Sequence, residues 1–192
     1  MPDPLQDPTQ GVRTTVTVAP TESFGARDSA FVILQASAST YVDLAQLDLA
    51  EPGRSIVALR GLLGSLQGAT QFDLPPDQRF YGGGTTTVRG FKYQSVGPLF
   101  PDRRPQGGTS IDAATVEFRQ RLFGSYGAVA FVDAGQVSAE SAPFRGTLRA
   151  GAGVGARYYT RIGAARLDVA VPLNKSPGDD SFEVYLGIGQ AF

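Results

Sequence analysis

The sequence lacks two residue types on which enzyme chemistry often depends. It has no cysteine and no histidine among its 192 residues, which excludes disulfide bonds, thiolate metal sites and the commonest general base. Most hydrolase mechanisms use a base or metal ligand of this kind. We therefore expect a protein that is not an enzyme, with no catalytic residue, no cofactor and no metal site.

Long apolar runs are also missing. No stretch approaches the roughly 18 consecutive apolar residues that indicate a membrane-spanning helix. The opening residues, Met1 to Leu5, do not resemble a signal peptide. The sequence does not exclude a transmembrane β-barrel, because barrel strands are only about 9–11 residues long and give a weak hydropathy signal.

The charges are nearly balanced and dispersed. There are 17 Lys and Arg against 18 Asp and Glu, a net charge of −1 with a pI of 5.4. A nucleic-acid-binding protein shows a basic patch, so we expect no nucleic-acid partner. Glycine, by contrast, is abundant: 24 of the 192 residues, or about 12%, are glycine, against about 7% in an average protein. This favours β-architecture with close backbone contacts.

Alternation of apolar and polar residues predicts an all-β fold of eight antiparallel up-and-down strands. A helix is an alternative to a strand only for residues 55–67, where Ala, Leu and Arg dominate. The strands are expected at 12–19, 30–44, 55–67, 111–122, 126–133, 148–159, 162–172 and 181–192.

Two features favour a membrane barrel over a soluble β-sandwich. One face of each strand is apolar while the other carries charges and glycines, which suits lipid outside and a wet lumen inside, although a sandwich would alternate too. Tight connections near 124 and 160 alternate with long ones, as in outer-membrane barrels, and the connection at 44–54 is intermediate. The long connections are 19–29, 68–109, 134–147 and 173–181. The residues expected to face lipid are Val154, Ala156, Leu167, Val169, Leu186 and Ile188.

The long loop 68–109 lies between the third and fourth strands and contains aromatic anchors and a glycine run. Arg89 lies among these anchors, and a buried guanidinium needs an acidic partner. The run Gly82-Gly83-Gly84-Thr85 lacks the Gly-Lys-Ser/Thr ending of a phosphate-binding loop.

Four signals then follow one another along the chain: Val88-Arg89-Gly90-Phe91, Glu117, Phe131-Val132-Asp133-Ala134-Gly135, and a last strand that ends on Phe192. In this order they resemble the bacterial outer-membrane assembly barrels that include BamA and TamA, the bacterial surface antigen family, with TamA the closer likeness. The segments from Asp7 to Gly11 and from Arg166 to Leu173 also look like TamA.

The resemblance implies an entry segment, 1–11, and a β-barrel domain, 12–192, that holds half of the family's sixteen strands. In the family the loop folds into the barrel and its Arg meets acids on the lumen wall, which implies that Arg89 pairs with Asp133 and Glu117 in a wall motif that includes Gly135. The alternatives are that Asp133 starts a turn with Gly135 and that Glu117 pairs with a neighbouring arginine of its own strand, Arg119 or Arg121.

The last strand resembles the signal by which outer-membrane proteins are recognised for assembly. Its alternative is that Phe192 caps a core strand. The signal residues are Phe182, Val184, Leu186, Ile188 and Phe192.

The implied function is insertion of outer-membrane proteins, of the translocation and assembly module type, by strand templating at the seam between the first and last strands. The implied location is the bacterial outer membrane, with the bilayer, outer-membrane or autotransporter clients and a second copy of the chain as partners. A passive barrel or pore and a soluble β-sandwich binding module stay as alternatives.

The strand number and the loop conflict if the barrel closes. Eight closed strands have an interior filled by side chains alone, which leaves no room for the 68–109 loop. Three arrangements remain: an open sheet, two copies that pair their edges, or a loop outside the barrel.

Overall fold

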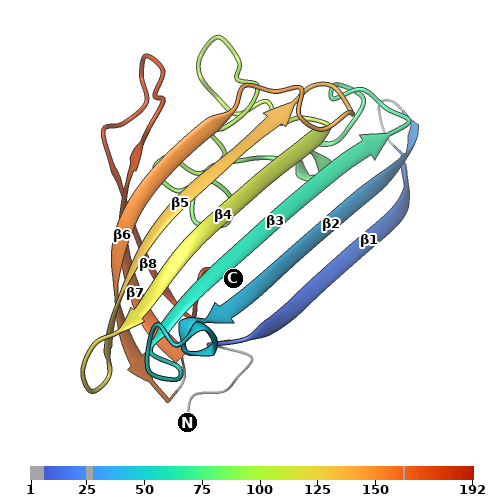
Figure 1. Ribbon diagram of the computed structural model, residues 1–192. Helices are drawn as coiled ribbons and strands as arrows, with labels where there is room; N and C mark the ends of the chain where they lie inside the picture. The colour runs from blue at the N-terminus through green and yellow to red at the C-terminus, as the bar shows by residue number, and fades with distance from the viewer. Residues whose placement is uncertain (1–6, 25–27, 162) are drawn as a thin grey trace.

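A computed structural model describes residues 7–24, 28–161 and 163–192. They form one eight-stranded antiparallel sheet in which every strand pairs with the next one along the chain (Figure 1). The predicted all-β, up-and-down fold is confirmed. The strands are β1 (Gly11–Ser23), β2 (Ser29–Asp43), β3 (Ser55–Gln67), β4 (Ser110–Arg121), β5 (Tyr126–Ser138), β6 (Arg149–Thr160), β7 (Gly163–Pro172) and β8 (Glu183–Ile188), with short 3-10 helices η1 (Leu44–Leu47) and η2 (Pro76–Gln78).

Residues 55–67 form strand β3 and not a helix. This strand pairs along its length with β2 on one side and β4 on the other, and its buried and exposed residues alternate. Pairing with two neighbours outweighs the helix propensity of its Ala, Leu and Arg residues. Within the described part of the chain, no helix is long and apolar enough to cross a membrane.

Three predicted strand ends are wrong. β1 continues to Ser23, past the proline at position 20. β5 continues beyond Asp133 to Ser138, because β4 begins at Ser110 and pairs with this extension, so that Gly135 lies in a strand and not in a turn. β8 ends at Ile188 and not at Phe192, because Gly189 takes a φ of 91° that breaks the strand. Residue 162, the expected start of the seventh strand, and residues 1–6 of the entry segment lie outside the described residues.

The sheet curls into a trough whose two faces differ. The loop 68–109 lies on the concave side (Figure 1), where its side chains pack against the wall, as Phe80 does against Leu62 and Ile111. The convex side is apolar and exposed. It carries the six residues expected to face lipid, all of them exposed: Val154, Ala156, Leu167, Val169, Leu186 and Ile188.

The sheet is open along one side. Among the described residues no bridge joins β1 to β8, so each is an edge strand. The first eight residues of β1, from Gly11 to Val18, are exposed on both faces. The chain by itself forms an open sheet with the loop inside its trough, so the arrangement with the loop outside the barrel does not occur.

The convex face provides a direct test of contact with lipid. Val154→Arg should lower the free energy of unfolding in lipid vesicles by about 2–4 kcal/mol if residue 154 lies near the bilayer midplane. Thr15→Arg is the matched control, because Thr15 is exposed on the concave face of β1. Denaturant titration of both variants measures the difference. Equal losses would show that the convex face does not meet lipid.

Candidate functional site

The loop 68–109 is folded back on itself before it meets the wall. Isolated bridges join Phe80 to Gly108 and Gly82 to Val96. Val88, Phe91 and Val96 are buried together. Because these contacts close the loop into a compact unit, the segment from Val88 to Phe91 is presented to the wall in one conformation.

Two glycines let this segment approach the wall closely. Gly90 has a φ of 99°, and a Cβ atom there would lie 2.8 Å from the carbonyl carbon of Val171 in β7. On the wall side, a Cβ atom at Gly151 of β6 would lie 1.9 Å from the carbonyl oxygen of Arg89. Real Cβ atoms do not tolerate such distances, so glycine at these two positions sets how deeply Arg89 sits.

Arg89 grips Asp133 through two parallel hydrogen bonds. Its Nε donates to Oδ2 at 2.7 Å and its Nη2 to Oδ1 at 3.0 Å, while the Arg89 backbone N–H donates to the same Oδ2 at 3.0 Å. Both residues are buried, with side chains that are 2% and 1% exposed. This forked geometry is available to arginine and not to lysine.

Glu117 holds the other side of the Arg89 guanidinium. Arg89 Nη1 donates to Glu117 Oε2 at 2.8 Å, and Arg119 Nε donates to Glu117 Oε1 at 2.9 Å. Glu117 therefore bridges the loop arginine and its own strand neighbour. The Cζ atom of Arg89 lies 3.3 Å from the centre of the Phe131 ring, so an aromatic face covers a cation that water does not reach.

A third acid completes the cluster, and the sequence reasoning did not identify it. Asp168 Oδ2 of β7 lies 3.5 Å from Arg89 Nη1, and its Oδ1 accepts a hydrogen bond from Arg157 Nη1 of β6. The cluster then holds three arginines and three carboxylates, and none is more than 3% exposed. We call it the clamp: Arg89, Arg119, Arg157, Glu117, Asp133 and Asp168.

Tyr185 of β8 fixes the backbone beside Arg89, and it too was missed. Its hydroxyl accepts a hydrogen bond from the Gly90 N–H at 2.9 Å and donates one to the Phe91 carbonyl at 3.0 Å. Asp168 and Tyr185 both belong to the polar phase of their strands. The alternation could have shown that these two residues face the inner side of the sheet. It could not have shown that β7 and β8 curve round far enough to reach the loop.

The remaining predicted residues lie in the loop, on the concave wall beside it, or in and next to β8. Val88 and Phe91 are buried in the loop cluster, and a Cβ atom at Gly135 would lie 3.0 Å from Val88 Cγ2. Of the expected assembly signal, Phe182 precedes β8 and is exposed, and Val184, Leu186 and Ile188 are exposed on the convex side. Phe192 instead lies on the concave side against Tyr41 of β2.

An ion pair at the rim of the trough differs from the clamp in burial. Lys92 Nζ lies 2.9 Å from Asp180 Oδ2, and both side chains are exposed. Their hydrogen bond raises the pKa of Lys92 and lowers the pKa of Asp180, so both groups are charged at neutral pH. Solvent screens such a pair, and it contributes little to stability.

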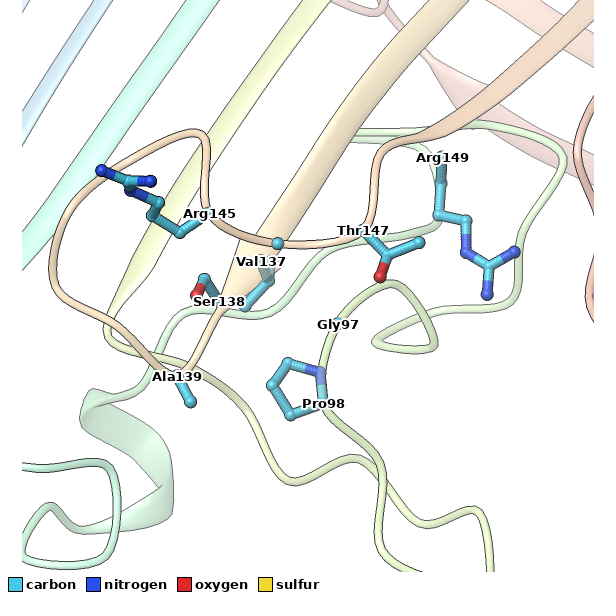
Figure 2. A pocket seen from close by; sticks show the side chains of 9 residues that line it. Gly97, Pro98, Val137, Ser138, Ala139, Arg145, Thr147 and Arg149 are labelled. Carbon is cyan, nitrogen blue, oxygen red and sulfur yellow. The ribbon is translucent and has the colours of Figure 1, made fainter.

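A polar pocket of about 320 Å³ lies where the loop meets the β5–β6 connection (Figure 2). Two arginines line it, but Figure 2 shows their guanidinium groups at opposite sides. Arg145 extends away from Arg149, whose guanidinium donates to the Asn174 carbonyl at 2.8 Å and to Ser176 Oγ at 2.6 Å. The pocket does not gather charges around one point.

An up-and-down antiparallel sheet with an apolar convex face and a loop locked inside its trough is typical of the wall of a β-barrel. The chain belongs to the Omp85 superfamily: the model of the Omp85 superfamily domain matches residues 3–192. The fold is similar to that of a solved structure of BamA from Haemophilus ducreyi lacking POTRA domains 1–3, with a TM-score of 0.70 at 21% sequence identity. The match covers 92% of this chain and 38% of that one, so the chain spans well under half of that protein's length.

The clamp predicts strong coupling between Arg89 and Asp133. Arg89→Ala and Asp133→Ala should each destabilise the docked loop by about 3–5 kcal/mol, because each leaves an uncompensated buried charge. The double variant should lose clearly less than the sum of the two, since it removes both charges. Limited proteolysis between residues 82 and 98 measures the opening of the loop.

Lys92→Ala is the matched control for this cycle. It removes a charge from the same loop without leaving a buried partner, so the protease sensitivity of the loop should stay at the wild-type level. Strictly additive effects of Arg89→Ala and Asp133→Ala would show that the two side chains do not act as a pair.

Proposed function

We propose that this chain is an outer-membrane protein assembly factor that acts without enzymatic chemistry. Its open sheet edge would serve as a template for the strands of incoming outer-membrane proteins. The observation that carries this proposal is the unpaired edge of β1 beside a wall whose loop is held in place by buried charges. Membership of the Omp85 superfamily supports it.

β1 has the length and the exposed backbone that a template needs. Of its 13 residues, nine precede Pro20, and this run of Gly11–Ala19 contains no proline. A spanning barrel strand needs about 9–11 residues. Natural proteins normally protect such an edge, because its free N–H and C=O groups pair readily with another strand. The run Gly11–Ala19 carries a single charged residue, Arg13, and is suited to strand addition.

The clamp supports the template by keeping the loop away from it. Its six side chains lie on the loop and on β4 to β7, and the concave face of β1 is left uncovered, with Arg13, Thr15 and Thr17 exposed. An incoming strand could therefore pair with β1 without displacing the loop. The wall and the template are separate parts of one sheet.

The proposed location is the bacterial outer membrane, with the bilayer against the convex face. The proposed clients are outer-membrane proteins, autotransporters among them, as for a translocation and assembly module. The β1 and β8 edges would also accept the edges of a second copy, which competes with clients for the same hydrogen bonds.

Proline substitutions in β1 test the template directly. In an antiparallel edge strand, successive N–H groups point alternately to the neighbour and to the open side. Of Thr15→Pro and Val16→Pro, one variant therefore loses a bond to β2 and the other loses a donor at the open edge. The variant that loses a donor at the open edge should slow client insertion roughly 2- to 10-fold, because one backbone hydrogen bond contributes about 0.5–1.5 kcal/mol.

The assay follows the folding of an unfolded outer-membrane barrel protein into vesicles that contain this protein. Thr15→Ala and Val16→Ala keep the N–H groups and should insert the client at the wild-type rate. If both proline variants also do so, the β1 edge is not the template. If the wild-type protein is no faster than empty vesicles, the chain is a passive barrel.

A further inference from the structure

The convex face of the sheet is hollowed over β4 to β7, away from both edges. A groove of about 770 Å³ lies there, and we call it the outer groove. Its floor is the outward side of β5, where the side chains of Ala128 and Ala130 are small. Phe118 of β4 and Val154 of β6 are the cross-strand partners of Ala130, and both are exposed, so they form the two walls. The groove is broader next to Ala128, because Ala156 is its partner on β6.

The two ends of the outer groove differ. At the end near the tight turn 122–125, the rings of Phe123, Tyr126 and Tyr158 lie in a row with centres 5.6 and 5.2 Å apart. Such aromatic residues gather where a barrel wall crosses the surface of the hydrocarbon core. At the other end Val132 follows Ala130 on the outward side of β5 and is 48% exposed, so a larger side chain stands where the floor would otherwise continue. The groove therefore opens at the membrane surface and ends inside the hydrocarbon core.

The length of the outer groove corresponds to one leaflet of a bilayer. Six residue steps separate Tyr126 from Val132, which is about 20 Å at roughly 3.3 Å per residue. Barrel strands tilt by about 35–45°, so the groove extends about 15 Å along the membrane normal. This is half of the roughly 30 Å hydrocarbon core. Tight turns lie on the periplasmic side of outer-membrane barrels, so the leaflet is the periplasmic one.

The width of the outer groove selects its occupant. β4 and β6 are two strand spacings apart, about 10 Å, and the side chains of Phe118 and Val154 narrow the space between them. A helix with its side chains is about 10–12 Å across and is too wide to enter. A single hydrocarbon chain is narrow enough to lie on Ala128 and Ala130.

The chemistry of the outer groove also favours a hydrocarbon chain. Gln120 lies at its edge, and both ends of its amide are already used: Oε1 accepts a hydrogen bond from Ser55 Oγ at 2.7 Å, and Nε2 donates to the Arg121 carbonyl at 3.0 Å. The Arg157 guanidinium belongs to the clamp on the concave side. The groove thus offers apolar surface and no free charge.

We propose that the outer groove binds one acyl chain of a phospholipid from the periplasmic leaflet. The chain lies along β5 with its headgroup at the three aromatic rings, and it stays bound longer than lipids elsewhere around the sheet. An empty groove would forfeit the dispersion contacts of its walls, and a bound chain restores them. The lipid thereby holds the firm part of the wall at a fixed depth in the bilayer. This inference goes beyond strand templating and rests only on the proposed position of the convex face in the bilayer.

The test uses a phospholipid with brominated acyl chains, because bromine quenches tryptophan fluorescence on contact. The chain has no tryptophan, so a single introduced one reports on one place. Phe118→Trp puts the reporter in the groove wall. Val116→Trp is the matched reporter, since Val116 is the next outward residue of β4 and does not line the groove. Each variant is reconstituted into brominated vesicles, extracted into lipid-free detergent and purified by gel filtration.

The reporter at position 118 should remain quenched after extraction, relative to the same variant taken from unbrominated vesicles. The reporter at position 116 should not, because its lipids are lost to the detergent. Native mass spectrometry of the wild-type protein should show one retained phospholipid for each chain. Equal quenching at the two positions, or a wild-type protein that carries no lipid, would overturn the proposal. A second protein chain in place of the lipid would do so too.

A groove-filling variant provides the second arm of the test. Ala130→Leu raises the floor between the two walls, so it should abolish both the retained lipid and the quenching at position 118. Ala152→Leu is the matched control, because it makes the same change on the outward side of β6 outside the groove, and it should keep the lipid. The loop between residues 82 and 98 should stay protected from protease in both variants, which shows that both are folded. Lipid retention that survives Ala130→Leu would contradict the inference.

The client-insertion assay separates this inference from the proposed function. Ala130→Leu should insert the client at the wild-type rate, because the groove lies on the wall and not at β1. A wild-type protein that retains the lipid but inserts no client would refute the proposed function and leave the lipid site standing. One that inserts clients but retains no lipid would refute the lipid site alone.

Discussion

The buried charge of Arg89 is the constraint on which the rest of the structure depends. An arginine that is only 1% exposed is tolerated only where carboxylates surround its guanidinium group. Asp133, Glu117 and Asp168 come from three different strands, so the sheet must curl before all three can reach one cation. Loop position and sheet curvature are therefore coupled through a single side chain. Any partial displacement of the docked loop would separate Arg89 from these carboxylates and leave a buried charge uncompensated. The loop is therefore held in one position.

The clamp also divides the sheet into two mechanically different parts. The wall from β4 to β7 is tied to the loop by charges, and β8 is tied to it through Tyr185. β1 is held by its ladder to β2 and has no second strand beside it among the described residues, and its first eight residues are exposed on both faces. A sheet with one firm wall and one lightly held edge can exchange a partner at that edge while the loop stays docked. Strand addition then needs no rearrangement of the buried charges.

The sequence predicted the strands well because alternation is a local property, and it predicted strand ends poorly because ends depend on neighbours. Gly135 looks like a turn residue, yet β4 continues far enough to keep it in the sheet. Arg89, Asp133 and Glu117 were brought together by the resemblance, with their polar phase in agreement. Asp168 and Tyr185 share that phase. Which polar residues meet the loop depends on curvature, which period-two patterning does not contain.

Phe192 shows how one backbone angle overrides a pattern. Were β8 to continue, Phe192 would share the outward phase of Val184, Leu186 and Ile188, but the φ of 91° at Gly189 cancels that phase. In lipid, an outward ring would be as well shielded from water as a ring packed against Tyr41. Apolar burial alone therefore does not decide between the two places. The inward position is favoured by what lipid cannot supply, which is a hydrogen-bond donor and two cations beside the ring.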